Sequence, residues 1–147
     1  MPEADFDWSD AFLVGYSPMD DTHREFVEVV GRLLGCPDAE LGAQMEAFRA
    51  HALRHFQQED DWMTATGFPG AQCHIDEHAA VLKSVEEVHA LVQSGRYDIG
   101  RDLAGELARW FPSHADHLDS ALAHWMVKRR TGGAPVVVRR NLPITLR

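Results

Sequence analysis

Histidine and carboxylate side chains recur along this chain at spacings that suit metal binding. Two pairs stand four residues apart, a His with a Glu and a His with a second His, so the members of each pair lie on one face of a helix. A further His is followed by an Asp five residues later, and a single His precedes them all. The seven positions are His23, His55, Glu59, His74, His78, His114 and Asp119. Nitrogen and oxygen donors of these types bind transition metals, so the pattern predicts a metal centre.

Four other histidines complete the nine in the chain: His51, His89, His117 and His124. His51 is one helical turn from His55, and His117 is three residues after His114, so either resembles a ligand by spacing. A single His pair at helical spacing is weak evidence for a site, whereas candidate ligands on four successive segments are strong evidence. We expect these four histidines at the surface or beside the ligands.

Glycine and proline residues divide the chain into four segments with helical periodicity. Apolar residues recur at intervals of three and four in each segment, and no stretch alternates long enough to favour a sheet. The expected helices span residues 18–35, 38–66, 70–94 and 98–130. Short turns make successive helices antiparallel, so residues 1–130 are expected to form one all-α domain, an up-down-up-down four-helix bundle.

Two further segments flank the expected bundle. An N-terminal arm covers residues 1–16, and its aromatic side chains are expected to cover part of the core. Ser17 before Pro18 predicts a helix N-cap. A C-terminal extension covers residues 131–147 and carries Arg139, Arg140 and Arg147 with the apolar run 136–138.

Composition limits the partners and the compartment. The formal net charge is −9, with 23 acidic residues against 14 Lys and Arg. Such a surface repels nucleic acid and anionic lipid. No apolar run approaches a membrane span of about 20 residues, and the N-terminus lacks the pattern of a signal peptide, so we expect a cytoplasmic protein. A single domain of this size with short turns is expected to be a monomer. Cys36 and Cys73 are expected to be free, buried thiols.

The motifs that contain the seven candidate ligands resemble those of the hemerythrin family, in its bacterial form, over residues 8–125. The matching segments are Trp8 with FLVG (12–15), DDTH (20–23), HFQQEDDWM (55–63), FP (68–69), HIDEH (74–78), and WFPSH (110–114) with Asp119. All seven ligand positions of the family pattern hold the expected residue type. The resemblance implies a non-haem centre of two iron ions joined by an oxo or hydroxo bridge.

The resemblance also implies how the ligands divide between the two irons. His74, His78 and His114 would saturate one iron, while His23 and His55 would hold the other. Glu59 and Asp119 would span both metals. With the bridge, these ligands leave a single open position, on the iron held by two histidines. A closed zinc site takes four ligands and usually includes thiolate, so iron is the better fit.

The expected function is reversible dioxygen binding, for storage, transport or scavenging, rather than enzymatic turnover. Di-iron oxygenases use mainly Glu with Glu-x-x-His pairs, whereas this imidazole-rich set is less anionic and favours returning the oxygen unchanged. Alternatives are a redox protein that reduces peroxide or nitric oxide, or releases iron, and an oxygen sensor. The recipient of the oxygen is left open.

The resemblance places five apolar residues around the open position: Phe26, Phe56, Trp110, Phe111 and Ala115. Ala115 stands where the family usually has a larger aliphatic residue, and Phe111 where Leu is common. Ala115 should therefore leave extra room beside the metals. We predict that Ala115→Ile slows autoxidation.

Two further expectations concern geometry near the ligands. The five residues from His114 to Asp119 would turn a regular helix by about 140° away from a shared face. Together with Pro112, this spacing predicts a distorted helix near residues 108–119, either a π-bulge or an Asp that reaches around the helix. Asp20, one turn before His23, is expected to orient that ring by a hydrogen bond.

Overall fold

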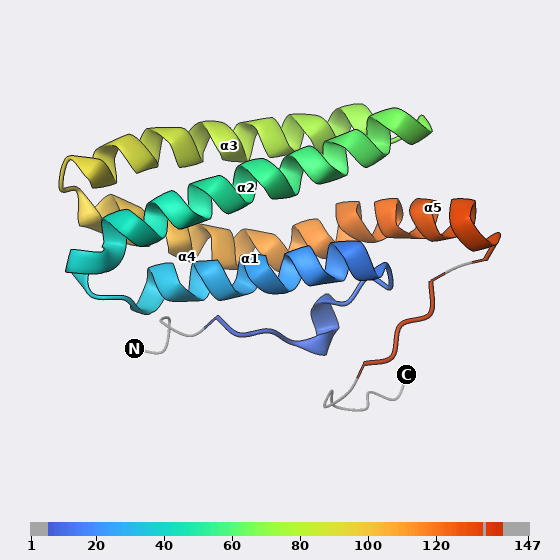
Figure 1. The fold of residues 1–147 in the computed structure, drawn as a ribbon, viewed down its shortest axis with the longest axis horizontal. Helices are drawn as coiled ribbons and strands as arrows, with labels where there is room; N and C mark the ends of the chain where they lie inside the picture. The colour runs from blue at the N-terminus through green and yellow to red at the C-terminus, as the bar shows by residue number, and fades with distance from the viewer. Residues whose placement is uncertain (1–5, 134, 140–147) are drawn as a thin grey trace.

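All regular elements among residues 6–133 and 135–139, which the computed structural model describes, are helical. The α-helices are α1 (Ser17–Gly35), α2 (Asp38–Thr66), α3 (Ala71–Gln93), α4 (Tyr97–His114) and α5 (Ser120–Thr131). A π-helical turn, η3 (Ala115–Asp119), joins α4 to α5 without a break, so these three form one long rod. The four rods pack side by side in alternating directions, which confirms the predicted antiparallel four-helix bundle (Figure 1).

Helix ends follow the local sequence, with one exception to the expected caps. Gly67 ends α2 in the left-handed conformation, with φ 67°, and its N–H donates to the Met63 carbonyl. The predicted cap at Ser17 is wrong, because α1 already begins at Ser17 and Tyr16 is its N-cap. The Tyr16 carbonyl accepts from the backbone N–H groups of Met19 and Asp20, so the helix begins at Ser17, one residue earlier in the sequence than predicted.

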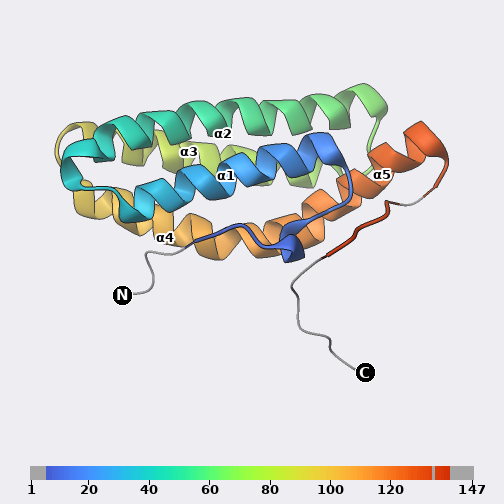
Figure 2. The same cartoon turned by 60° about the horizontal axis from the view of Figure 1, so that its bottom comes forward.

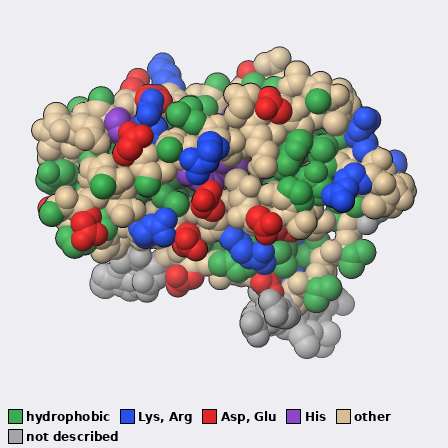
Figure 3. Space-filling model, in the orientation of Figure 1, with side chains coloured by type: hydrophobic (Ala, Val, Ile, Leu, Met, Phe, Trp, Pro, Cys, Tyr) green, Lys and Arg blue, Asp and Glu red, His purple; other side chains and the backbone are tan. Residues whose placement is uncertain are grey.

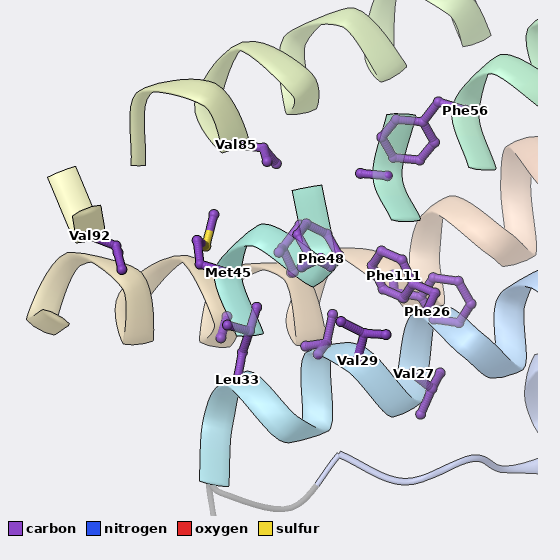
Figure 4. Close-up of a cluster of buried hydrophobic side chains, with 14 of the residues drawn as sticks. Phe26, Val27, Val29, Leu33, Met45, Phe48, Phe56, Val85, Val92 and Phe111 are labelled. Carbon is purple, nitrogen blue, oxygen red and sulfur yellow. The ribbon is translucent and has the colours of Figure 1, made fainter. Parts of the chain in front are cut away.

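The buried apolar side chains form two clusters along the bundle. The larger one contains Phe26, Phe48 and Phe111, which point into the space between α1, α2 and α4 (Figure 4). The smaller one contains Met19 and Met63, with side chains from α5. On each of α1 and α2 the candidate ligands lie between residues of the two clusters. The polar positions are therefore enclosed between two apolar layers.

The N-terminal arm packs along the bundle, as expected from its aromatic residues (Figure 2). Phe6 and Phe12 contact the ring of Phe111, with centroids 6.3 and 5.3 Å away. Residues 135–139 of the C-terminal extension lie against the arm, where Arg139 donates to the Leu13 carbonyl. Residues 1–5, 134 and 140–147 of the two predicted flanking segments lie outside the described residues.

The surface charges and the two cysteines can be compared with the expectations from composition. Acidic and basic side chains are interspersed on the face in Figure 3, and little histidine is visible there. Within the described residues, no helix is long and apolar enough to cross a membrane. Both cysteines are free, but the prediction that they are buried is wrong, since Cys36 is half-buried and Cys73 is exposed. Cys73 precedes the buried His74 by about 100° on α3, which turns it outward.

Candidate metal centre

The seven candidate ligand side chains converge between the two apolar clusters. α1 contributes one of them, α2 and α3 two each, α4 one, and the π-helical turn one. Each is buried, with at most 4% of its surface exposed. The members of the cluster are His23, His55, Glu59, His74, His78, His114 and Asp119. Their ligand atoms form two adjoining groups suited to metal ions, and Glu59 belongs to both.

The two oxygens of Glu59 face different histidines. Oε2 lies 3.1 Å from Nε2 of His55 and 3.3 Å from Nε2 of His23. Oε1 lies 3.2 Å from Nε2 of His78 and 3.4 Å from Nε2 of His74. The carboxylate therefore stands between two pairs of imidazoles, with one oxygen directed to each pair.

Asp119 divides its oxygens in the same way. Oδ2 lies 3.1 Å from Nε2 of His23, whereas Oδ1 lies 3.0 Å from Nε2 of His74 and 3.2 Å from Nε2 of His114. With Glu59, this separates His23 and His55 from the three remaining histidines. The arrangement has room for one cation beside each set, with both carboxylates between them.

The π-helical turn brings Asp119 to the same face as His114. In a π-turn the backbone hydrogen bond spans five residues, and here the Ser120 N–H donates to the Ala115 carbonyl. Residues five apart therefore nearly superimpose along the axis. Pro112 lies one turn earlier and has no N–H to donate. The predicted helix distortion is confirmed, and the π-bulge is the alternative that the chain adopts.

Carboxylates outside the cluster hold the outward nitrogens of two histidines. Asp60 Oδ1 lies 2.8 Å from Nδ1 of His78, and Glu77 Oε1 lies 2.8 Å from Nδ1 of His114. A carboxylate accepts hydrogen bonds, so each Nδ1 donates its proton, and Nε2, which points into the cluster, is the nitrogen available to bind a metal. This is the tautomer that a metal-ligating imidazole requires.

The electrostatics of the metal-free cluster show how strongly it attracts positive charge. Burial lowers the pKa of His23, but the charge of Asp119 and hydrogen bonds with Asp119 and Glu59 outweigh it and raise the pKa to about 10. Burial likewise lowers the pKa of His74, but hydrogen bonds with the same two carboxylates raise it to about 9. Burial raises the pKa of Glu59, while the surrounding histidines lower it well below its usual value. Protons thus occupy the place that metal cations would take.

The unpaired atoms of the cluster fit a pair of metal ions. Nε2 of His78 and Nε2 of His114 are buried without a hydrogen-bond partner among the described residues. Each of these nitrogens lies 3.2 Å from a carboxylate oxygen, an arrangement that is favourable only when a proton or a metal ion lies between the two atoms. Leaving buried polar atoms unpaired costs about 1–3 kcal/mol each, and metal coordination removes that cost.

Aromatic rings close the cluster toward the larger apolar layer. Phe111 stacks on Phe26, with ring centroids 4.8 Å apart, and its edge contacts His23 at 5.1 Å. Phe56 stacks on His78 at 4.2 Å and lies 5.0 Å from the ring of His55. These three phenylalanines are almost completely buried. They keep the side of the cluster that faces the larger layer dry.

The two remaining residues expected around the open position differ in placement. Ala115 is buried in the first position of the π-helical turn, directly after His114. Trp110 is half-buried, stacks on His114 at 4.2 Å, and donates its indole N–H to Glu77. Trp110 therefore also helps to orient the carboxylate that holds His114.

Three expectations around the ligands have different outcomes. Asp20 does not orient His23: its two oxygens accept from the backbone N–H groups of Val14 and Gly15, which fastens the arm to α1. His117 is exposed and His51 is buried beside His55, so each lies in one of the two places expected for it. The carboxylates of Asp60 and Glu77 were missed, although each directly adjoins a ligand in the sequence, Glu59 and His78 respectively. That adjacency was the available signal.

Comparison with known proteins agrees with this geometry. The family model described as the hemerythrin HHE cation binding domain matches residues 14–125. A bacteriohemerythrin of Ralstonia nicotianae is 34% identical over 83% of this chain and 89% of its own length. A hemerythrin chain of Sipunculus nudus is 25% identical over 78% of this chain and 87% of its own length.

A solved structure is similar in fold. The crystal structure of a mutant hemerythrin superposes with a TM-score of 0.71 at 20% identity, covering 79% of this chain and 95% of that one. At this identity the likeness shows the fold alone. The domain match and the bacterial relative show more, and on their evidence this chain belongs to the hemerythrin family.

Proposed function

We propose that the cluster holds two iron ions, joined by an oxo or hydroxo bridge, and that this centre binds dioxygen reversibly. The observation that carries the proposal is the division of each carboxylate between two sets of histidines. Glu59 directs one oxygen to His23 and His55 and the other to His74 and His78. Carboxylates placed in this way suit two adjacent six-coordinate ions better than one four-coordinate zinc ion.

The uneven number of histidines supports a single open position. His74, His78 and His114 provide three nitrogen ligands on one side, whereas His23 and His55 provide two on the other. Ferrous ions at these positions would supply the electrons that dioxygen takes up when it binds. The open position would lie on the side of His23 and His55, where a small ligand enters.

The side chains near that position favour binding without further reaction. Phe26 and Phe111 lie against the rings of His55 and His23 and offer no proton donor. Phe56 closes the cluster between His55 and His78. An apolar wall excludes the water and anions that promote oxidation of the metals. The residues therefore serve to hold, shield and release the ligand.

Oxygenation cycles on the reconstituted protein test the proposal. The metal-free chain would be loaded with ferrous iron without air and then exposed to oxygen, while the visible spectrum is recorded through repeated deoxygenation. We expect two irons per chain and a charge-transfer band that disappears and returns with each cycle. His55→Ala should lose the band, whereas His117→Ala, at an exposed position outside the cluster, should keep it.

Irreversible conversion to a ferric form at first exposure, with catalytic consumption of peroxide, would identify a redox enzyme instead. Failure to retain two irons per chain would contradict the di-iron centre itself.

We also propose that the protein acts as a monomer, which sedimentation of the iron-loaded form tests directly. A dimer at micromolar concentration would contradict that part.

A further inference from the structure

A hydrogen-bonded chain of two side chains connects the ring of His55 to the protein surface. Nδ1 of His55 lies 3.1 Å from Nε2 of His51 on the same helix. Nδ1 of His51 lies 2.6 Å from Oε1 of Glu25 on α1. His51 is buried, whereas the Glu25 side chain is half exposed. The chain thus runs from solvent through α2 to the cluster.

The direction of each hydrogen bond follows from the acceptor at the outer end. The Glu25 carboxylate accepts, so Nδ1 of His51 donates and Nε2 of His51 keeps a lone pair. A ring that binds metal through Nε2 carries its proton on Nδ1, so His55 donates to His51. Both hydrogen bonds are then donated toward the protein surface. The Nε2 lone pair of His55 points toward Oε2 of Glu59, which lies 3.1 Å from that nitrogen.

Two phenylalanine rings flank His51. The rings of Phe26 and Phe48 lie 6.0 and 6.3 Å from its centroid and offer no hydrogen-bond partner. Arg54 lies 3.6 Å from the same Glu25 oxygen and holds the carboxylate from the other side. A surface pocket of about 230 Å³ is lined by Glu25, His51 and Arg54 and reaches His55.

His55 differs in this respect from two histidines of the other set. His78 and His114 each donate directly to a carboxylate. A carboxylate on the outer nitrogen raises the basicity of an imidazole ligand. His55 instead donates to a neutral imidazole, which transmits less negative charge. Nδ1 of His23 and Nδ1 of His74 are both buried without a partner among the described residues, so the two sets differ only in the partners of His55, His78 and His114.

We propose that Glu25 and His51 are positioning residues that fix the tautomer and orientation of His55, and that the metal held by His23 and His55 is the more weakly bound of the two. This inference rests on the proposed di-iron function. Without His51, the Nδ1 proton of His55 would be buried without an acceptor, and the ring would be free to turn away from the metal. The other metal, held by the three remaining histidines, would be unaffected.

Metal retention in three variants tests this. His51→Leu removes the acceptor, His51→Gln keeps a side-chain oxygen in its place, and His89→Leu is the matched control. His89 also joins two helices through a carboxylate, with Nε2 2.7 Å from Glu46, but it touches no ligand. Each protein would be loaded with ferrous iron, and separately with Co²⁺, and then titrated with a chelator while the metal content is measured.

We expect the wild type and His89→Leu to lose their two metals in two steps. In His51→Leu the first step should occur at about 10- to 100-fold lower chelator concentration, with the second step unchanged. His51→Gln should lie near the wild type. Equal chelator midpoints for His51→Leu and His89→Leu would overturn the inference. A Glu25→Ala variant with the chelator midpoints of the wild type would overturn the role assigned to Glu25. A wild type that binds fewer than two metals would instead contradict the proposed function.

Nitrogen-15 NMR of the zinc-loaded wild type provides a test that does not depend on any variant folding. We expect His51 to carry its proton on Nδ1 and His55 to carry its proton on Nδ1 with Nε2 bound to zinc. A proton on Nε2 of His51 would reverse the direction of both hydrogen bonds and overturn the inference.

Discussion

Single side chains outside the cluster decide how the ligand rings are presented. Glu77 accepts from both His114 and Trp110, so one carboxylate orients a ligand and the indole stacked on it. The Glu77 side chain is 37% exposed, yet its partner His114 is almost fully buried. A surface carboxylate therefore orients a buried candidate ligand.

Glu77→Gln is expected to weaken metal binding at the side of His114. The amide oxygen still accepts from Nδ1, but the negative charge that makes the imidazole basic is lost, so metal affinity should fall by about tenfold. Chelator titration of the iron-loaded protein measures the change. Glu106→Gln, which removes an exposed carboxylate paired with Arg109 on the same helix, should leave the titration unchanged.

Ala115→Ile is expected to slow autoxidation of the oxygenated protein. The larger side chain narrows the space beside the proposed open position and excludes water, at a cost of about 1–3 kcal/mol from overpacking. Decay of the oxygenated absorbance, followed by stopped flow, measures the rate. Ala104→Val, in the same apolar layer but away from the ligands, should lower stability without slowing the decay. An unchanged or faster decay in Ala115→Ile would reject the idea.

Among the elements, the irregular segments position the candidate ligands and cover the bundle together with the helices. The π-helical turn supplies the extra residue that aligns Asp119 with His114. The helix that follows it, α5, contributes side chains to the smaller apolar cluster. The arm is fastened by Asp20, whose oxygens accept from Val14 and Gly15. Residues 135–139 then cover the arm, so the two flanking segments support each other.

Gly15→Ala is expected to displace the C-terminal segment from the arm. Gly15 has φ 89°, and a Cβ there would lie 2.6 Å from Cβ of Pro135 and 2.9 Å from Cγ2 of Val137. Left-handed strain and this clash together should cost about 1–3 kcal/mol. Urea unfolding measures the loss, and limited proteolysis should cleave the segment faster. Gly35→Ala, where a Cβ meets nothing within 4 Å, should show neither effect.

For the whole molecule, the buried cluster couples folding to bound cations. Two carboxylates and five imidazoles lie between apolar layers, and protons on His23 and His74 partly balance the negative charge in the metal-free state. Metal ions bound at the proposed centre would replace those protons and satisfy the unpaired atoms. The bundle is therefore expected to be more stable with metal than without it.

The metal-free protein is expected to lose stability as the pH rises above neutrality. The pKa values of His23 and His74 are raised in the folded state to about 10 and about 9, from 6.5 in the unfolded chain. Their contribution is thus fully present below pH 6.5 and is lost as the pH passes through 9 to 10. Urea unfolding at pH 6.5 and 9.5 measures this. The metal-loaded protein, in which the protons are already replaced, should lose much less, and equal losses would contradict the explanation.

The sequence by itself determined the helices and the ligand types. Helical periodicity, Gly and Pro positions, and spacings such as His55 to Glu59 are local properties, because residues four apart share a face of any α-helix. The five-residue interval from His114 to Asp119 even predicted the distorted turn, since both residues had to face one cluster. Resemblance to a family added the expected division of the ligands.

Only the tertiary structure decided which groups surround the ligands. Asp60 meets His78 across 18 residues, Glu25 meets His51 across 26, and Glu77 meets His114 across 37. Each of these contacts depends on how two helices are rotated and shifted against each other, which no local pattern specifies. The same reason explains Asp20: its position on α1 suggested a contact with His23, but the arm supplies two N–H donors to its carboxylate.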